Sequence, residues 1–287
     1  MKAKFFLSVV LVLSGLAACT TAGRPELSGM SFSDEPLIGK FIWHDLITED
    51  IDAARKFYGG LFGWSFEKGA NVRGKGYVIA RSGNAYVAGL MPIESQADGG
   101  KISRWLPFVS VANVDDSVAT STAAGGQVVV NARDVPFGRV AAIIDPQGAV
   151  LGLARSAIGD PDDKTTAAAP GRAVWSELHT SDAVAATSFY KSVVGYDAKT
   201  IERRGGEFVV LGTHGRTDGG ILKNPVDEWK PAWMTFFGVE DPAAAAELAV
   251  QLGGTLLLAP SADFREGRIA LVADPSGALL VLRKWAI

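Results

Sequence analysis

The sequence predicts an α+β protein made of two similar units, each with one curved mixed β-sheet that forms an open cup. Three observations support this prediction. One set of motifs occurs twice along the chain at a nearly constant spacing, and each occurrence shows the order βαβββ twice. The composition is that of an ordinary globular protein, with 48% hydrophobic and 21% charged residues among 287, and this length accommodates about two domains.

The repeat begins with a strand-like string that carries a tryptophan. The string FIWHDL at 41–46 corresponds to AVWSEL at 173–178, an offset of 132 residues. Paired aromatic and turn motifs follow at offsets of 132 and 129: Phe57-Tyr58 with Phe189-Tyr190, Gly63-Trp64 with Gly195-Tyr196, and Asp145-Pro146-Gln147-Gly148 with Asp274-Pro275-Ser276-Gly277. Self-similarity at a fixed spacing indicates duplicated structural units. We therefore expect one domain at 37–156, a polar linker at 157–170 and a second domain at 171–287.

Each domain divides into two βαβββ modules. In the first module, a strand at 40–48 precedes a helix that is N-capped by Asp50 and expected to end at Gly59-Gly60. The remaining elements of the first domain are short strands near 64–67, 76–81 and 85–91, a strand at 106–111, a helix at 115–124, and strands near 127–131, 139–144 and 149–154. One face of each sheet is expected to pack on helices, so the other face lines the cup.

The first residues predict export and lipid attachment. Lys2 and Lys4 precede an apolar run at 5–13, which is shorter than the ~20 residues of a membrane-spanning helix. The string Leu-Ala-Ala at 16–18 followed by Cys19 resembles the lipobox of bacterial lipoproteins, in which cleavage occurs before a lipidated cysteine. Residues 1–18 would then be a signal peptide and residues 19–36 a lipidated tether.

The expected partner of this segment is a membrane, contacted through the lipid anchor. The expected location is the bacterial cell envelope. Thr20 is not the acidic residue that retains lipoproteins in the inner membrane, so in a source with an outer membrane we expect sorting there, facing the periplasm.

Composition and charge exclude several classes of site. A net charge of −3, from 28 Lys and Arg against 31 Asp and Glu, gives no basic footprint for a nucleic-acid partner. The single cysteine excludes an internal disulfide and a thiolate zinc cluster, and three histidines supply few imidazole ligands.

The repeated motifs resemble those of the vicinal oxygen chelate superfamily, which includes glyoxalases, bleomycin resistance proteins and dioxygenases. The resemblance covers nearly the whole chain after the tether, and it implies two tandem glyoxalase-like domains. Because this fold supports isomerases, dioxygenases, thiol transferases and binding proteins, the resemblance alone does not assign an activity.

Enzymes of the superfamily typically hold a divalent metal at the floor of the cup with His and Glu side chains. Carried over residue by residue, the four ligand positions in the first domain are Trp43, one residue of 88–90, Leu106 and Gly152. In the second domain they are Trp175, one residue of 219–221, Met234 and Val281. None of these residues is a metal ligand, so we expect no metal site and no cofactor. Neighbouring His44 alternates away from Trp43 and is expected to face away from the cup.

Strand alternation places other polar residues inside the cups. Trp43 and Asp45 are expected there in the first domain, and Trp175, Glu177 and His179 in the second. An aromatic ring beside a carboxylate suits a small organic molecule, so these five residues are the candidate ligand-binding residues. No catalytic residue is assigned.

Three functions remain open at this point. The leading hypothesis is a lipid-anchored envelope protein whose cups bind a small organic molecule without metal. The second is a metal-dependent lyase, isomerase or dioxygenase with rearranged ligands, such as Asp45, Glu177 and His179. The third is an interaction or structural protein whose cups are filled by side chains.

Overall fold

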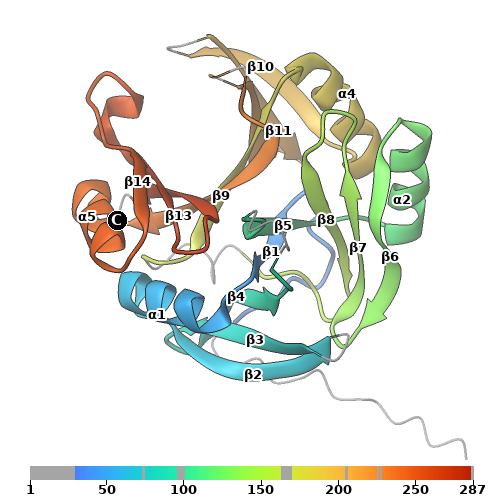
Figure 1. Cartoon of the computed structure of the whole chain (residues 1–287). Helices are drawn as coiled ribbons and strands as arrows, with labels where there is room; N and C mark the ends of the chain where they lie inside the picture. Colours follow the sequence, from blue (N-terminus) through green and yellow to red (C-terminus); the bar gives the residue numbers. More distant parts are fainter. Residues whose placement is uncertain are drawn as a thin grey trace, which may run out of the picture.

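A computed structural model describes residues 30–72, 75–95, 101–162, 170–203, 206–224, 226 and 228–285. Cys19, the predicted signal peptide and most of the predicted tether lie outside these residues. The described chain forms two eight-stranded sheets, one in each predicted domain, which confirms the α+β class (Figure 1).

The first sheet has the strand order β2-β3-β4-β1-β5-β8-β7-β6. Its strands are β1 (Phe41–Thr48), β2 (Ser65–Val72), β3 (Lys75–Ser82), β4 (Ala85–Pro92), β5 (Arg104–Ser110), β6 (Gln127–Val135), β7 (Gly138–Ile144) and β8 (Val150–Ser156). In each module the first strand pairs in parallel with the last, β1 with β4 and β5 with β8, and the modules meet at the antiparallel β1–β5 pair.

The second sheet repeats this order as β10-β11-β12-β9-β13-β16-β15-β14. Its strands are β9 (Ala173–Thr180), β10 (Asp197–Arg203), β11 (Gly206–Thr213), β12 (Arg216–Lys223), β13 (Ala232–Val239), β14 (Thr255–Leu258), β15 (Ile269–Ala273) and β16 (Leu279–Lys284). A short 3-10 turn, η1 (Arg265–Gly267), lies between β14 and β15.

Each module contributes one α-helix that starts at an Asp or Asn. The helices are α1 (Ile51–Phe62), α2 (Val114–Ala123), α4 (Ala183–Val194) and α5 (Pro242–Gln251). In all four, the side-chain oxygen of the N-cap residue accepts a backbone N–H of the first turn, as Asp50 does from Ala53. The N-cap predicted at Asp50 is therefore confirmed.

The predicted end of α1 at Gly59-Gly60 is wrong. The helix continues to Phe62 and ends at Gly63, which adopts the left-handed conformation with φ 68°. A Cβ on Gly60 would lie 2.7 Å from the Leu252 side chain, which belongs to the other domain. Gly60 thus permits close packing between the domains rather than ending the helix.

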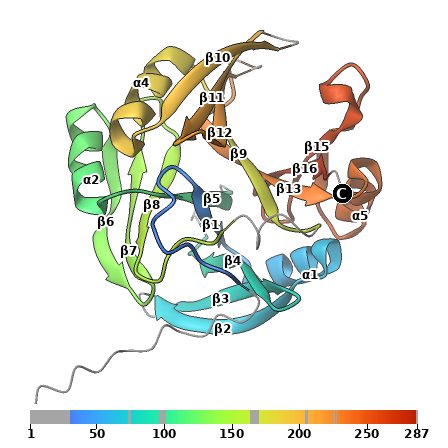
Figure 2. The same cartoon turned by 180° about the vertical axis from the view of Figure 1, so that it is seen from behind.

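The hydrophobic core lies between the two sheets. Helix α1 lies beside α5, and α2 lies beside α4, as both views show (Figures 1 and 2). One core cluster contains Tyr58 and Trp105 of the first domain together with Phe237 of the second, and the Trp105 and Phe237 rings are 4.9 Å apart. The domains therefore share their core. His44 of β1 and Ser176 of β9 meet across it at 3.2 Å, so the opposite faces of these two strands, which carry Asp45 and Glu177, point away from each other.

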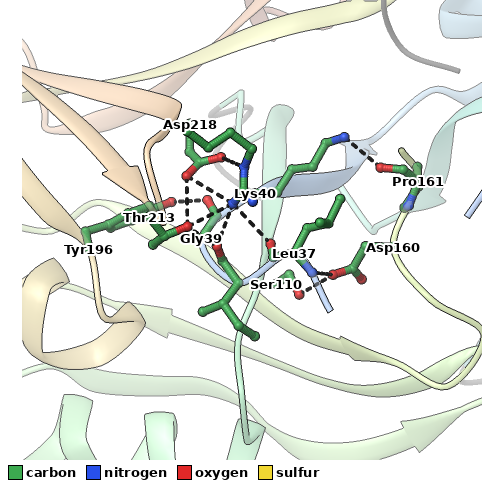
Figure 3. Close-up of polar contacts among 11 residues, drawn as sticks. Leu37, Gly39, Lys40, Ser110, Asp160, Pro161, Tyr196, Thr213 and Asp218 are labelled. Carbon is green, nitrogen blue, oxygen red and sulfur yellow. Dashed lines mark hydrogen bonds and ion pairs between the residues drawn. The ribbon is translucent and has the colours of Figure 1, made fainter. Parts of the chain in front are cut away.

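Part of the predicted linker is built into the fold. Asp160 is 1% exposed, and its Oδ2 accepts hydrogen bonds from Ser110 Oγ at 2.6 Å and from the Leu37 backbone N–H at 2.7 Å (Figure 3). The other domain holds the same segment, because Tyr196 Oη donates to the Gly39 carbonyl at 2.6 Å. Residues 37–40 are thus fixed between the linker and the second domain.

The end of the predicted tether is also fixed. Phe32 forms an isolated β-bridge with Pro161, and the backbone N–H of Ser33 donates to the carbonyl of Asp160 at 2.8 Å. Residues 31–33 of the predicted tether are therefore paired with residues 160–162.

Candidate functional site

The inner faces of the central strands bring the candidate residues of each cup together. In the first domain, β1 places Asp45 opposite Gly89 of β4 and Leu106 of β5. In the second domain, Glu177 of β9 takes the equivalent place, opposite Gly220 of β12 and Met234 of β13. Each cup therefore has one carboxylate on this row of its central strands.

The first cup holds a closed group of three polar side chains. Trp43 Nε1 donates to Asp45 Oδ1 at 2.7 Å, and Tyr77 Oη donates to the same oxygen at 2.6 Å. A Cβ on Gly89 would lie 1.7 Å from Tyr77 Oη and 2.2 Å from Asp45 Oδ1, so the glycine leaves the room that these two groups fill. The pair of Trp43 and Asp45 predicted from the sequence is brought together as expected.

Burial favours the neutral form of Asp45. The residue is only 5% exposed, and this burial raises the pKa of its carboxyl above the usual value. Hydrogen bonds from Tyr77 and Trp43 and the charge of Arg133 offset the burial only in part. The carboxyl group in the first cup is therefore neutral over a wider pH range than an exposed aspartate.

The second cup holds an ionic group around Glu177, whose side chain is 0% exposed. Arg265 binds it with both terminal nitrogens, with Nη2 2.6 Å from Oε1 and Nη1 3.2 Å from Oε2. His179 Nε2 lies 3.1 Å from Oε1, and Trp175 Nε1 donates to Oε2 at 3.2 Å. Trp175, Glu177 and His179 are thus directly bonded, as their alternation along β9 predicted.

The pKa of Glu177 is displaced in the direction opposite to that of Asp45. Burial alone raises the pKa of Glu177, but the hydrogen bonds and charges of His179 and Arg265 together hold it below the usual glutamate value. The carboxylate is therefore ionised at neutral pH and anchors Arg265 inside the cup.

Arg265 reaches the cup from a loop with unusual backbone geometry. It lies between β14 and β15, and both Arg265 (φ 49°) and Glu266 (φ 58°) adopt positive φ although neither is glycine. Such conformations cost free energy and persist where surrounding contacts enforce them. The bidentate contact with Glu177 is one such contact.

The metal-ligand positions of the superfamily do not fit a metal in either cup. Across the sheet, Trp43 pairs with Phe108, and Phe108 pairs with Gly152. A Cβ on Gly152 would lie 2.4 Å from the Phe108 ring, so this ring occupies the space that a ligand side chain at Gly152 would need. The equivalent row in the second domain is Trp175, Phe236 and Val281. Within the described ranges, no three His, Cys, Asp or Glu side chains gather as a metal site requires.

His44 lies outside both cups, as predicted. It is 6% exposed, and its Nε2 lies 3.2 Å from Ser176 Oγ, the residue at the equivalent position of the other domain. Burial lowers the pKa of His44 to about 3. A cavity of about 320 Å³ adjoins this contact between the domains, and its lining includes Phe41, His44, Trp175, Arg216 and Trp285.

Sequence reasoning missed two residues of the cups. Tyr77 had a detectable signal, since it occupies the β3 position that corresponds to Phe208 of β11, and both aromatic side chains lie over a glycine of the next strand. Arg265 had none, because it lies in a loop whose path no local pattern specifies.

Family comparisons match both domains. Residues 40–153 match the family described as the glyoxalase/bleomycin resistance protein/dioxygenase superfamily, and residues 175–282 match the glyoxalase-like domain family. CFP32 of Mycobacterium tuberculosis, named as a candidate glyoxylase, is 34% identical over 249 residues, covering 85% of this chain and 94% of that protein. The anthracycline biosynthesis protein DnrV of Streptomyces peucetius is 28% identical over 256 residues, covering 82% and 90% of the two chains.

Solved structures share the fold at low sequence identity. The 2,3-dioxygenase LapB from Pseudomonas sp. KL28 superposes with a TM-score of 0.59 at 12% identity, over 88% of this chain and 94% of that one. The Mn(II)-bound glyoxalase from Novosphingobium aromaticivorans gives a TM-score of 0.57 at 15% identity, over 87% and 83%. Together with the matches over both domains, these similarities show that the chain belongs to the glyoxalase/bleomycin resistance protein/dioxygenase superfamily and carries two of its domains in tandem.

Proposed function

We propose that this protein is a lipid-anchored envelope protein whose cups bind a small organic molecule without a divalent metal. The proposal rests on the floor of each cup, where residues that cannot bind a metal stand in place of the family's metal ligands. Positions that hold metal ligands in the family carry Trp43, Gly152, Trp175 and Val281. The polar groups present instead are a tryptophan indole bonded to one carboxylate.

This exchange favours recognition of an organic molecule. An indole face offers apolar contact, and the carboxylate with its neighbours offers a few directed hydrogen bonds, which together are typical of small-molecule sites. DnrV, whose name places it in the biosynthesis of anthracyclines, is a relative over most of the chain. Its name supports a search that begins with planar polycyclic compounds.

The metal-dependent alternative would require Asp45, Glu177 and His179 to share one ion. Asp45 is bonded to Trp43 and Tyr77 on the inner face of the first sheet, while Glu177 and His179 are bonded to each other on the inner face of the second. Since these inner faces point away from each other, the three groups do not support a common metal site.

The lipid anchor is proposed from the Leu-Ala-Ala-Cys string that ends at Cys19. Among the described residues, no helix is long and apolar enough to cross a membrane. Replacing Cys19 with alanine in the full chain should move the protein from the membrane fraction to the soluble fraction of the envelope and abolish incorporation of labelled palmitate. Retention in the membrane fraction by the Cys19→Ala variant would refute the anchor.

The metal-free cup is tested by elemental analysis of the full chain, extracted in detergent and purified without chelator or histidine tag. We expect far less than one zinc, nickel, manganese or iron per chain and no rise in melting temperature on adding these ions. A stoichiometric metal lost on Asp45→Asn or Glu177→Gln substitution would overturn the proposal. The metal-dependent function would then be favoured.

A further inference from the structure

The second cup carries more positive charge than its carboxylate balances. Arg283 lies on β16, on the same face as Val281, and its position corresponds to Ala154 of β8 in the first domain. Among the described residues, Arg283 makes no hydrogen bond or ion pair with another side chain. The carboxylate that acts on it is Glu177, which Arg265 and His179 already share.

Two other arginines, Arg203 and Arg265, lie on the walls of the same cup, each over an aromatic ring. Burial lowers the pKa of Arg283, and the charges of Arg265, Arg268 and Arg203 lower it further. Arg265 comes from the loop between β14 and β15, whereas Arg203 comes from β10 on the opposite wall. A half-buried arginine that other positive charges act on is unfavourable in the free protein, so Arg283 indicates a site that a counter-charge completes.

Aromatic rings lie beside these charges. The guanidinium of Arg203 lies 4.0 Å from the centre of the Phe208 ring, and that of Arg265 lies 5.7 Å from the centre of the Phe236 ring. Phe208 itself fills the space over Gly220, next to Glu177. A ligand that satisfies the site therefore combines an anionic group with an apolar, preferably flat, body.

We propose that the second cup binds an organic oxyanion, such as an aromatic carboxylate, with Arg283 as its principal charge partner and with Arg203 and Arg265 beside it. This inference rests on the proposed metal-free cup and adds the chemical class of its ligand. Arginine suits this role because its planar fork matches a carboxylate in two hydrogen bonds. The first cup, with Ala154 at the equivalent position, is not expected to share the preference.

Two probes of the same shape test the charge requirement. Titration calorimetry on the detergent-purified full chain, with EDTA present, compares 2-naphthoate with the neutral 2-naphthamide. We expect naphthoate to bind more tightly, and its affinity to fall as salt screens the arginines. Equal binding of the two probes would overturn the anion site and leave the metal-free cup standing. Binding of both only when a divalent ion replaces the EDTA would overturn both proposals.

Variants locate the binding at Arg283. Arg283→Ala should weaken naphthoate roughly tenfold or more, the effect expected for a lost hydrogen bond to a charged group, and leave naphthamide unchanged. Arg283→Lys should retain part of the affinity. Arg55→Ala removes one positive charge from α1 in the other domain and serves as the matched control, which should not change naphthoate binding.

The melting temperature of the free protein separates a ligand site from a structural arginine. Because Arg283→Ala relieves repulsion among the arginines, it should leave the melting temperature unchanged or raise it at low ionic strength. The wild-type chain should gain melting temperature on adding naphthoate or inorganic phosphate, and the variant should gain less. A lower melting temperature for the variant, with no response of the wild type to either anion, would contradict the proposal.

Discussion

Tyr58 of the first domain donates a hydrogen bond from its Oη to Oδ2 of Asp274 in the second domain, at 3.1 Å. The reciprocal bond joins Tyr190 Oη to Asp145 Oδ2 at 2.9 Å. Each tyrosine is the second residue of a repeated Phe-Tyr motif, and each aspartate begins a repeated Asp-Pro-x-Gly turn. The repeated motifs therefore form the joint between the domains. The Phe-Tyr motif of each domain bonds to the Asp-Pro-x-Gly turn of the other.

The first prediction concerns this joint. Tyr58→Phe should lower the free energy of unfolding by about 1–3 kcal/mol, because it removes the donor to Asp274 and the acceptor of Trp105 Nε1 in a buried site. Urea unfolding measures the change. Tyr86→Phe is the control, since its hydroxyl bonds Glu67, whose side chain is 39% exposed. A loss no larger than that of the control would show that the joint contributes little.

The second prediction concerns the pH dependence of stability through His44. Its pKa is about 3 in the folded chain because of burial, against an ordinary value of 6.5. As the pH falls below 6.5, the unfolded chain therefore binds a proton that the folded chain does not, so stability falls by up to about 1.4 kcal/mol per pH unit until the pH approaches 3. His44→Gln should flatten this dependence in urea unfolding at pH 7, 6 and 5. An identical slope in both proteins would contradict it.

The third prediction is that isosteric substitutions in the two cups have opposite effects at neutral pH. The raised pKa of Asp45 means that its favourable contribution is complete below the unfolded value and is lost as the pH rises through the folded value. Asp45→Asn should therefore raise the free energy of unfolding at pH 7 by about 0.5–2 kcal/mol. The gain should vanish in acid.

The pH dependence of stability has the opposite sign for Glu177. Its lowered pKa gives stability that is present above the unfolded value and lost as the pH falls through the folded value. Glu177→Gln should therefore lower the free energy of unfolding at pH 7 by about 1–3 kcal/mol, because Arg265 and His179 lose a charged acceptor. Thermal unfolding of both variants at pH 7 and pH 4 measures the contrast, and changes of the same sign at pH 7 would refute it.

The fourth prediction concerns the space beside Gly152, which occupies a position that carries a metal ligand in enzymes of the family. Gly152→Ala should lower the free energy of unfolding by about 1–3 kcal/mol, because the added carbon would lie 2.4 Å from the Phe108 ring. Gly76→Ala is the matched control, since an added Cβ there meets nothing within 4 Å and Gly76 is an exposed position of β3. If Gly152→Ala folds as stably as Gly76→Ala, Phe108 moves readily and the cup floor is more open than the contacts indicate.

The sequence predicted the architecture because the repeat contains the information twice. Strand alternation placed Trp43 with Asp45 and Trp175 with Glu177 and His179, and the structure brings each group together. Alternation succeeds here because side chains two positions apart on a strand necessarily share a face. The predicted helix end at Gly59-Gly60 was wrong, since a glycine inside a helix has the same local signature whether it ends the helix or admits a neighbour such as Leu252.

The sequence by itself therefore determined the two-domain α+β fold and the superfamily, because these depend on residue types at fixed local spacings. Only the tertiary structure decided that Arg265 enters the second cup, that Tyr77 closes the first, and that Tyr58 reaches Asp274. Arg265 and Glu177 are 88 residues apart and Tyr58 and Asp274 are 216 apart. Such contacts follow from how sheets, helices and loops pack as a whole, and no periodicity within one element encodes them.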